Sequence, residues 1–119
     1  MRLKVYGIPN CDMVKKALVW LKQNNLEFDF HDYKKAGISK AKLKEWCSRV
    51  NWENVFNMRS STWRSLAKEG ASLPGSATQA IALMQANTSV IKRPIIEVNG
   101  EIILGFDEKE YFQKLINHS

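Results

Sequence analysis

The stretch LKVYGIPNC, residues 3–11, decides the fold of the N-terminal part of the chain. Residues 3–6 alternate between apolar and polar character, which predicts a short strand, and residues 7–10 break the alternation as a tight loop. From Cys11 onward apolar residues recur at spacings of three and four, which predicts an amphipathic helix. The sequence therefore predicts a strand, a loop and a helix in direct succession, with Cys11 at the start of the helix.

The segments flanking this helix extend the pattern. We expect Asn10 to cap its N-terminus, and Asn24 and Asn25 to close it. Residues 26–31 alternate again, which predicts a second strand. Because one helix joins the two strands, it is expected to act as a crossover between parallel neighbours.

The central third of the chain is predicted to be helical, without a strand. Its expected elements are a helix from Ser39, a loop or short helical turn over residues 51–61, and helices over residues 62–68 and about 76–85. The first of these helices places Trp46 and Cys47 on an apolar face.

The C-terminal part predicts a hairpin and a final helix. Strands are expected over residues 95–98 and 101–104, joined by Asn99-Gly100, a pair typical of type I′ turns because both positions need a positive φ. A helix over residues 107–116 follows. The side chains predicted to face the core are Tyr111, Phe112, Leu115 and Ile116.

This order of elements predicts an α/β fold: a thioredoxin-like mixed sheet (βαβ…ββα) with an all-helical inserted subdomain. We expect a single domain over residues 1–119, with the helical insert at about 39–90. The length of 119 residues fits one domain. A composition of 45% hydrophobic and 25% charged residues excludes disordered and low-complexity classes.

Composition also bounds location and partners. No apolar run approaches 18 residues, and the N-terminus lacks the apolar core of a signal peptide, so we expect a cytoplasmic protein without a membrane partner. The net charge of +6 suits an anionic ligand. Basic residues are not interleaved with aromatic ones in a nucleic-acid module, so nucleic acid is not an expected partner. A monomer is expected.

Cys11 is the strongest candidate for chemistry. At a strand–loop–helix junction, the amides and dipole of the helix N-terminus favour a negative charge, and Lys15, one turn on, adds a positive one. A thiolate here would be a nucleophile near neutral pH. The alternative is a small buried side chain with a packing role only.

The second cysteine does not form a dithiol motif with the first. A Cys-x-x-Cys motif would place its second thiol at Val14, so any resolving thiol must come from elsewhere. We expect Cys47 to pack in the core. His31 and His118 are isolated and have no metal-ligand spacing with the cysteines, so no metal site is predicted.

Three arginines are candidates for anion binding, because guanidinium groups suit oxyanions. Arg59 and Arg64 lie in the helical middle region, where surface positions are the ordinary alternative. Arg93 precedes Pro94 at the start of a predicted strand, a position where proline is tolerated. In a thioredoxin-like fold this proline commonly has a cis peptide bond and faces the active-site cysteine, which would bring Arg93 close to Cys11; an ordinary strand entry is the alternative.

Taken together, several motifs resemble those of the arsenate reductase (ArsC) and Spx-related family, most closely its YffB-type subgroup. The resemblance covers essentially the full length. It rests on YGIPNCD at 6–12, VKKA at 14–17, HDY at 31–33, NMR at 57–59, TWR at 62–64, IKRP at 91–94 and LGF at 104–106.

This resemblance implies a thioredoxin-like fold with a nucleophilic Cys11. In arsenate reductases of the family the thiolate attacks arsenate held by three arginines, and glutathione with glutaredoxin regenerates the enzyme. Arg59 and Arg93 match two of these arginines, and Phe106 stands at the third position. The predicted substrate-binding residues are Arg59, Arg93, Asn10, Lys15 and Pro94.

Three functions are therefore weighed. The first is a glutathione-dependent monothiol reductase without a bound cofactor, with glutathione as co-substrate, glutaredoxin as a further candidate partner, and a small oxyanion or a disulfide as substrate. The second is an arsenate reductase, against which Phe106 counts. The third is a non-enzymatic Spx-like regulator that binds RNA polymerase, against which Val14 counts because such regulators usually carry a Cys-x-x-Cys switch.

Overall fold

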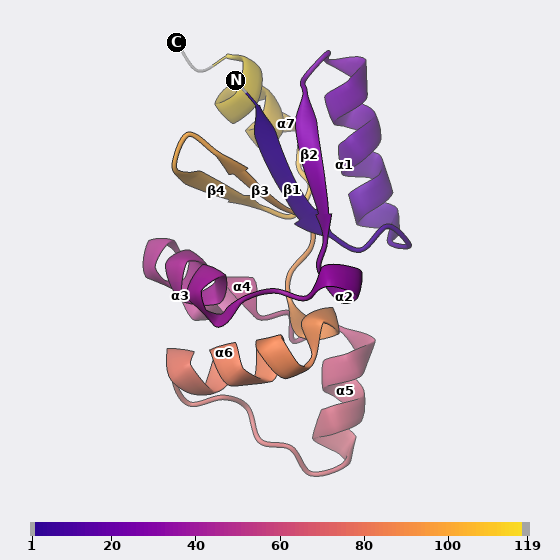
Figure 1. The fold of residues 1–119 in the computed structure, drawn as a ribbon. Helices are drawn as coiled ribbons and strands as arrows, with labels where there is room; N and C mark the ends of the chain where they lie inside the picture. Colours follow the sequence, from indigo (N-terminus) through magenta and orange to yellow (C-terminus); the bar gives the residue numbers. More distant parts are fainter. Residues whose placement is uncertain (1, 118–119) are drawn as a thin grey trace. The chain divides into compact units, whose positions relative to one another are not determined.

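The computed structural model describes residues 2–117, which divide into two compact units (Figure 1). The first unit holds residues 2–32 and 93–117, and the second holds residues 33–92. None of the helices within the described range has the length and apolar character that a bilayer span requires.

A four-stranded mixed sheet forms the first unit. The strands are β1 (Leu3–Gly7), β2 (Phe28–Asp32), β3 (Ile95–Val98) and β4 (Glu101–Leu104), in the order β2-β1-β3-β4. β1 is parallel to β2, and β3 is antiparallel to both β1 and β4. This arrangement confirms the predicted α/β class and the thioredoxin-like sheet.

Helix α1 (Asp12–Gln23) connects β1 to β2, as a crossover between parallel strands requires. It begins one residue later than expected, since Cys11 and not Asn10 occupies the N-cap, with φ −148° and ψ 126°. Asn10 is exposed in the preceding loop. The prediction that Asn10 caps this helix was therefore wrong.

The second strand also begins later than expected, at Phe28 and not at residue 26. The intervening residues are used to end α1: Asn25 has a φ of +56°, and the Leu26 N–H donates to the Leu21 carbonyl at 3.0 Å. The chain cannot pair in the sheet until this turn is complete.

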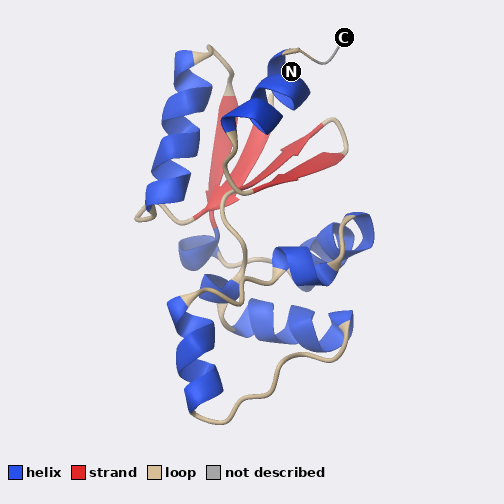
Figure 2. Cartoon of the chain, turned by 180° about the vertical axis from the view of Figure 1, so that it is seen from behind, coloured by secondary structure: helices blue, strands red, loops and turns tan. Residues whose placement is uncertain are grey.

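Two helices cover one face of the sheet. In Figure 2 the C-terminal helix lies in front of the strands and α1 runs alongside them, and both helices share one buried cluster with the sheet. Its fully buried members are Leu3, Val5, Ala17, Leu21, Ile96, Val98, Ile103, Tyr111 and Leu115. Burying these apolar side chains is the main stabilising term of the first unit.

The C-terminal helix consists of α7 (Glu108–Tyr111) and a π-helical turn, η2 (Phe112–Ile116). Tyr111 and Leu115 are buried as predicted, but Phe112 is 48% exposed and Ile116 is 38% exposed. The prediction that Phe112 and Ile116 face the core was wrong, because only one narrow face of the helix, with Tyr111 and Leu115, contacts the sheet. Phe112 follows Tyr111 around the helix and lies at the surface beside Trp20.

The turn between β3 and β4 has the predicted conformation. Asn99 and Gly100 have φ values of +48° and +80°, which confirms the turn predicted between the two strands.

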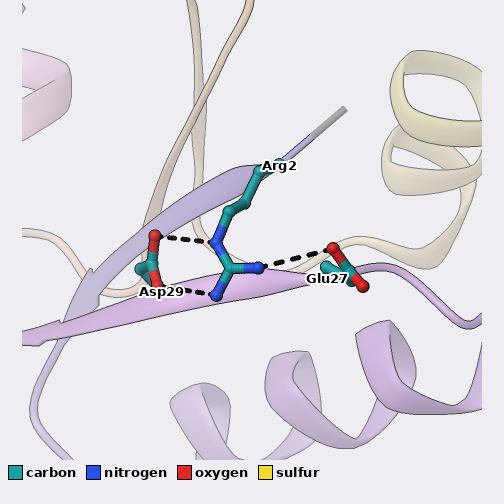
Figure 3. Close-up of polar contacts among 3 residues, drawn as sticks. All are labelled: Arg2, Glu27 and Asp29. Carbon is teal, nitrogen blue, oxygen red and sulfur yellow. Dashed lines mark hydrogen bonds and ion pairs between the residues drawn. The ribbon is translucent and has the colours of Figure 1, made fainter.

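An ion-pair cluster lies at the start of β1. The Arg2 guanidinium donates to both carboxylate oxygens of Asp29 at 2.9 and 2.8 Å, and to the Glu27 carboxylate at 3.4 Å (Figure 3). The same contact lowers the pKa of Asp29.

The second unit is built from short helices. These are α2 (Tyr33–Ala36), α3 (Lys40–Arg49), α4 (Trp52–Val55), α5 (Ser61–Lys68), α6 (Ala77–Ala86) and the 3₁₀ turn η1 (Thr88–Val90). The N-termini of α3, α4, α5 and α6 are capped by side chains of Ser39, Asn51, Ser60 and Ser76, each accepting from a backbone N–H of its own first turn. Between residues 33 and 92 the β-type pairing amounts to one isolated antiparallel bridge, Phe56 with Ile91.

Candidate active site

Cys11 lies at the junction between the loop after β1 and the first turn of α1. Its carbonyl accepts from the Lys15 N–H at 2.9 Å, while its side chain makes no capping hydrogen bond. The residue is half-buried. The first amides of a helix have no intrahelical acceptor, so they and the helix dipole favour an anion at this end. The arrangement suits a thiolate.

Gly7 sets how closely this loop approaches the sheet. A Cβ at position 7 would lie 2.9 Å from Cγ2 of Val14, closer than real Cβ contacts. The first turn of α1 can therefore rest directly on the end of β1 only because residue 7 is glycine. The sequence pattern identifies Gly7 only as a break in the strand, although a glycine at a strand end is also a signal for close backbone approach.

Strand register brings Pro94 to the same end of the sheet as this loop. Tyr6 pairs with Ile95 across β1 and β3, so the chain leaves β1 toward Cys11 beside the point where Pro94 enters β3. Pro94 is buried, Arg93 is half-buried, and the peptide bond between them is cis. The first unit thus places the Cys11 loop, Arg93 and Pro94 at one edge.

Tyr111 supports the neighbouring strand end. Its hydroxyl donates to the Gly105 carbonyl, and the Gly105 N–H donates to the Pro94 carbonyl at 2.8 Å. The Phe106 ring packs edge-on against Tyr111 at 5.2 Å, as does Trp20 at 5.5 Å. Burial raises the pKa of the Tyr111 hydroxyl, with a smaller contribution from Glu110. The apolar periodicity of residues 107–116 predicts Tyr111 only as a core residue. It does not indicate the hydrogen bond from the Tyr111 hydroxyl to Gly105.

The remaining predicted binding residues are exposed. Lys15 lies on α1 one turn after Cys11, and Asn10 lies in the preceding loop. Arg59 belongs to the second unit, directly before the N-cap of α5, where its N–H donates to the Asn57 side chain at 3.1 Å. Arg64 is exposed on α5.

The segment that carries Arg59 is anchored inside the second unit. The Asn57 N–H donates to the Val90 carbonyl, and the Lys92 N–H donates to the Val55 carbonyl, both at 2.7 Å. These two hydrogen bonds flank the bridge between Phe56 and Ile91. The backbone near Arg59 is therefore tied to the residues that immediately precede Arg93 in the chain.

Cys47 differs from Cys11 in its surroundings. It is half-buried on α3, next to the fully buried Trp46. Desolvation raises the pKa of its thiol, which favours the protonated, unreactive form. Its position agrees with a packing role rather than a nucleophilic one.

The described residues contain no group of three metal-ligating side chains close enough to hold an ion. The His31 ring packs against Tyr6 with centroids 5.1 Å apart. His118, the other histidine considered in the sequence, lies outside the described residues.

The mixed sheet, the helix-capping cysteine and the proline at the neighbouring strand start define a protein of the thioredoxin-like class. A model of the ArsC family matches residues 6–113. The chain belongs to the ArsC family.

Individual relatives agree with this assignment. The solved structure titled "YFFB (PA3664) protein" is 39% identical, with a TM-score of 0.87 over 95% of this chain and 98% of that one. An uncharacterized protein of Haemophilus influenzae is 41% identical, over 92% of this chain and 95% of its own length. The global transcriptional regulator Spx of Streptococcus mutans is 29% identical, over 86% of this chain and 74% of its own length. The family resemblance inferred from the motifs is confirmed.

Proposed function

We propose that this protein is a glutathione-dependent monothiol reductase with Cys11 as its nucleophile. One observation carries the proposal: Cys11 places a thiol at the N-cap of α1, and no second thiol stands one turn further on. Val14 occupies that position and is fully buried against Gly7. The resolving thiol must therefore come from elsewhere. Burial raises the pKa of Cys47, the other thiol of the chain, and disfavours its thiolate, so the proposal takes glutathione as the resolving thiol.

The reaction proceeds by two thiol–disulfide exchanges. The Cys11 thiolate attacks the glutathione sulfur of a mixed disulfide, forms a Cys11–glutathione disulfide and releases the substrate thiolate, which takes up a proton. A second glutathione thiolate then attacks the glutathione sulfur on Cys11, releasing oxidised glutathione and the Cys11 thiolate. One disulfide is reduced and one is formed, so electrons balance.

The arginines and the loop supply anion binding in this proposal. Arg93 and Arg59 would hold the carboxylates of glutathione, and Lys15 and Asn10 would contact the same ligand near Cys11. Pro94 would face the mixed disulfide. A charge-assisted hydrogen bond of this kind contributes about 1.5–3 kcal/mol.

Arsenate reduction is the second candidate, and membership of a family that includes arsenate reductases favours it. Phe106 argues against it, because an aromatic ring packed on Tyr111 replaces a guanidinium at the third anion-binding position. Losing one such contact weakens oxyanion binding by about 1.5–3 kcal/mol. A regulator resembling Spx is the third candidate, favoured by the 29% identity to the Streptococcus mutans protein.

One assay separates these functions. The purified protein is given glutathione and either a glutathione mixed disulfide or arsenate, with and without glutaredoxin, and formation of oxidised glutathione is followed with glutathione reductase and NADPH. We expect turnover of the mixed disulfide alone. Arsenate-dependent turnover that requires glutaredoxin would instead support the second function, and a stable RNA polymerase complex in a pull-down without any turnover would support the third.

A further inference from the structure

A groove runs along α1 on the side that faces the end of β4. Its walls are Lys15, Lys16, Val19, Trp20, Gln23, Phe106 and Glu108, and its volume is about 490 Å³. We call it the α1–Phe106 groove. That volume is within the range of ligand sites, about 300–1,000 Å³. A second depression of about 540 Å³ adjoins it, sharing Trp20 and Glu108 and continuing to Phe112.

The groove begins one helical turn from Cys11. Lys15 and Val19 are spaced by four residues and lie along one stripe of α1, and Cys11 precedes them at the N-cap, where its carbonyl accepts from the Lys15 N–H. At a rise of about 1.5 Å per residue, Lys15 is about 6 Å and Val19 about 12 Å along the axis from Cys11. In the first exchange step the substrate sulfur is bonded to the glutathione sulfur that Cys11 attacks, so the polypeptide that carries the substrate sulfur could extend into the groove.

Charge and apolar surface define what would fit. Among residues 2–117, neither Lys15 nor Lys16 forms an ion pair, whereas Arg2 and Lys114 do. Val19 is 52% exposed, and the Trp20 and Phe106 rings are half-buried beside it. Lys15 and Lys16 thus make the α1 wall near Cys11 cationic, Glu108 adds one negative charge elsewhere in the lining, and Val19, Trp20 and Phe106 offer apolar contact.

We propose that the α1–Phe106 groove binds the polypeptide on either side of the disulfide that Cys11 reduces. The favoured segment carries an acidic side chain followed by a large apolar one. An extended chain advances about 3.4 Å per residue, so residues two to four positions from the substrate cysteine would reach Lys15 through Val19. This inference rests on the proposed function, and it names the substrate class as glutathione mixed disulfides on acidic, apolar polypeptide segments.

Three matched peptides test it: Ac-Cys-Ala-Glu-Leu-NH₂, the same peptide with lysine in place of glutamate, and the same peptide with serine in place of leucine. Each is joined to glutathione as a mixed disulfide and offered to the full-length protein in the coupled assay. We expect the first to be turned over about threefold to tenfold faster than the other two, since exposed charge pairs give modest preferences.

Two charge reversals on the same helix locate the effect. Lys16→Glu should abolish or invert the preference for the glutamate peptide over the lysine peptide. Lys22→Glu makes the same charge change on α1 but outside the groove, so it should leave the preference intact. Equal turnover of all three peptides, or equal loss of preference in both variants, would overturn the groove proposal while the reductase function stands.

A binding measurement keeps the two proposals separable. If neither the peptides nor a small glutathione disulfide is turned over, the reductase function fails. Fluorescence anisotropy of the labelled acidic peptide with Cys11→Ser protein then tests whether the groove binds the peptide, independently of the reductase function. Binding that Lys16→Glu weakens and Lys22→Glu does not would support it, and binding equal in all three proteins would refute it.

Discussion

The two units of the chain hold their candidate functional residues by different means. In the first unit, backbone pairing places the Cys11 loop and Pro94 at one sheet edge, through the register of β1 with β3. In the second unit, side-chain caps at the starts of short helices set the local geometry, and Arg59 is exposed directly before one of them. The sheet unit thus positions Cys11, the proposed nucleophile, through strand pairing, whereas Arg59 of the helical unit lies in an exposed segment before a helix.

The largest difference between the units should appear at their cysteines. Cys11→Ser is expected to reduce turnover of a glutathione mixed disulfide to the uncatalysed rate, because the nucleophile is lost. Cys47→Ser is the matched control in the second unit and should keep most of the activity. Mass spectrometry should show faster iodoacetamide labelling at Cys11 near pH 7, since burial raises the pKa of Cys47. Activity retained in Cys11→Ser would refute the proposed mechanism.

A comparison of two glycines tests how tightly the first unit is packed. Gly7→Ala should destabilise the protein by about 1–3 kcal/mol, because the new Cβ overpacks against Val14. Gly75→Ala is the control, since its Cβ would meet only the end of the flexible Gln79 side chain at 3.4 Å.

Urea unfolding measures both glycine variants, and Gly7→Ala combined with Val14→Ala supplies a double-mutant cycle. Non-additivity in favour of the double variant is expected because the shorter side chain makes room for the added methyl group. Equal midpoints for Gly7→Ala and Gly75→Ala would show that α1 can move away from β1 without cost.

The arginines distinguish the contributions of the units to substrate binding. Arg59→Ala and Arg93→Ala should each raise the KM for a glutathione mixed disulfide by about tenfold, the equivalent of one weak charge-assisted contact. Arg64→Ala should have a smaller effect, because it does not match an anion-binding position of the family motif. Steady-state kinetics of the three variants check this. A larger effect at Arg64 than at Arg59 would make Arg64 the substrate-binding arginine of the second unit.

Two buried tyrosines compare hydrogen bonds in the two units. Tyr111→Phe removes a short bond to the buried Gly105 carbonyl, and we expect a loss of about 1–2 kcal/mol. Tyr33→Phe removes longer contacts, 3.3 and 3.4 Å, to the Ile91 and Lys92 carbonyls. Its expected loss is smaller, about 0.5 kcal/mol. Chemical denaturation measures both, and the reverse order would contradict the geometry.

The smallest effect concerns alkaline pH. Burial raises the pKa of Cys47 in the second unit and of Tyr111 in the first. Above about pH 9 the unfolded chain therefore releases these protons before the folded chain does, and the free energy of unfolding falls as pH rises. Urea midpoints from about pH 8 to about pH 11 should show this decline. Cys47→Ser should reduce it in the lower part of the range, and Tyr111→Phe in the upper part.

Much of the fold could be predicted because the elements that the local sequence patterns predict are the ones that pair in the sheet. The alternation before Gly7, the periodicity after Cys11 and the Asn99-Gly100 turn each specify one element, and their order leaves few topologies. The errors lie in where α1 and β2 begin and in which side chains of the last helix face the sheet. Sequence periodicity does not fix which residue takes the extended N-cap conformation, and the exposure of Phe112 depends on how the last helix is rotated against the sheet.

Two residues of the candidate site, Cys11 and Pro94, could be singled out from the sequence, whereas the Tyr111 contact beside them could not. Cys11 and Pro94 stand out by position in the chain, since a strand precedes one and follows the other. Tyr111 does not, because its hydrogen bond to Gly105 arises only when the last helix folds back over the sheet. Tertiary contacts of this kind leave no periodic trace in the sequence.

The register of the sheet determines how far apart the two attachment points of residues 33–92 lie, and therefore whether this segment could be removed or replaced. Asp32 pairs with Gly7 on one side of β1, and Pro94 enters β3 on the other side, so the chain departs and returns about two strand spacings, about 10 Å, apart. Within the second unit, the Tyr33 hydroxyl contacts the carbonyls of Ile91 and Lys92, which keeps its own two ends together. Residues 33–92 therefore form a cassette that could be excised and bridged by a few residues, or exchanged for another, without altering any strand pair.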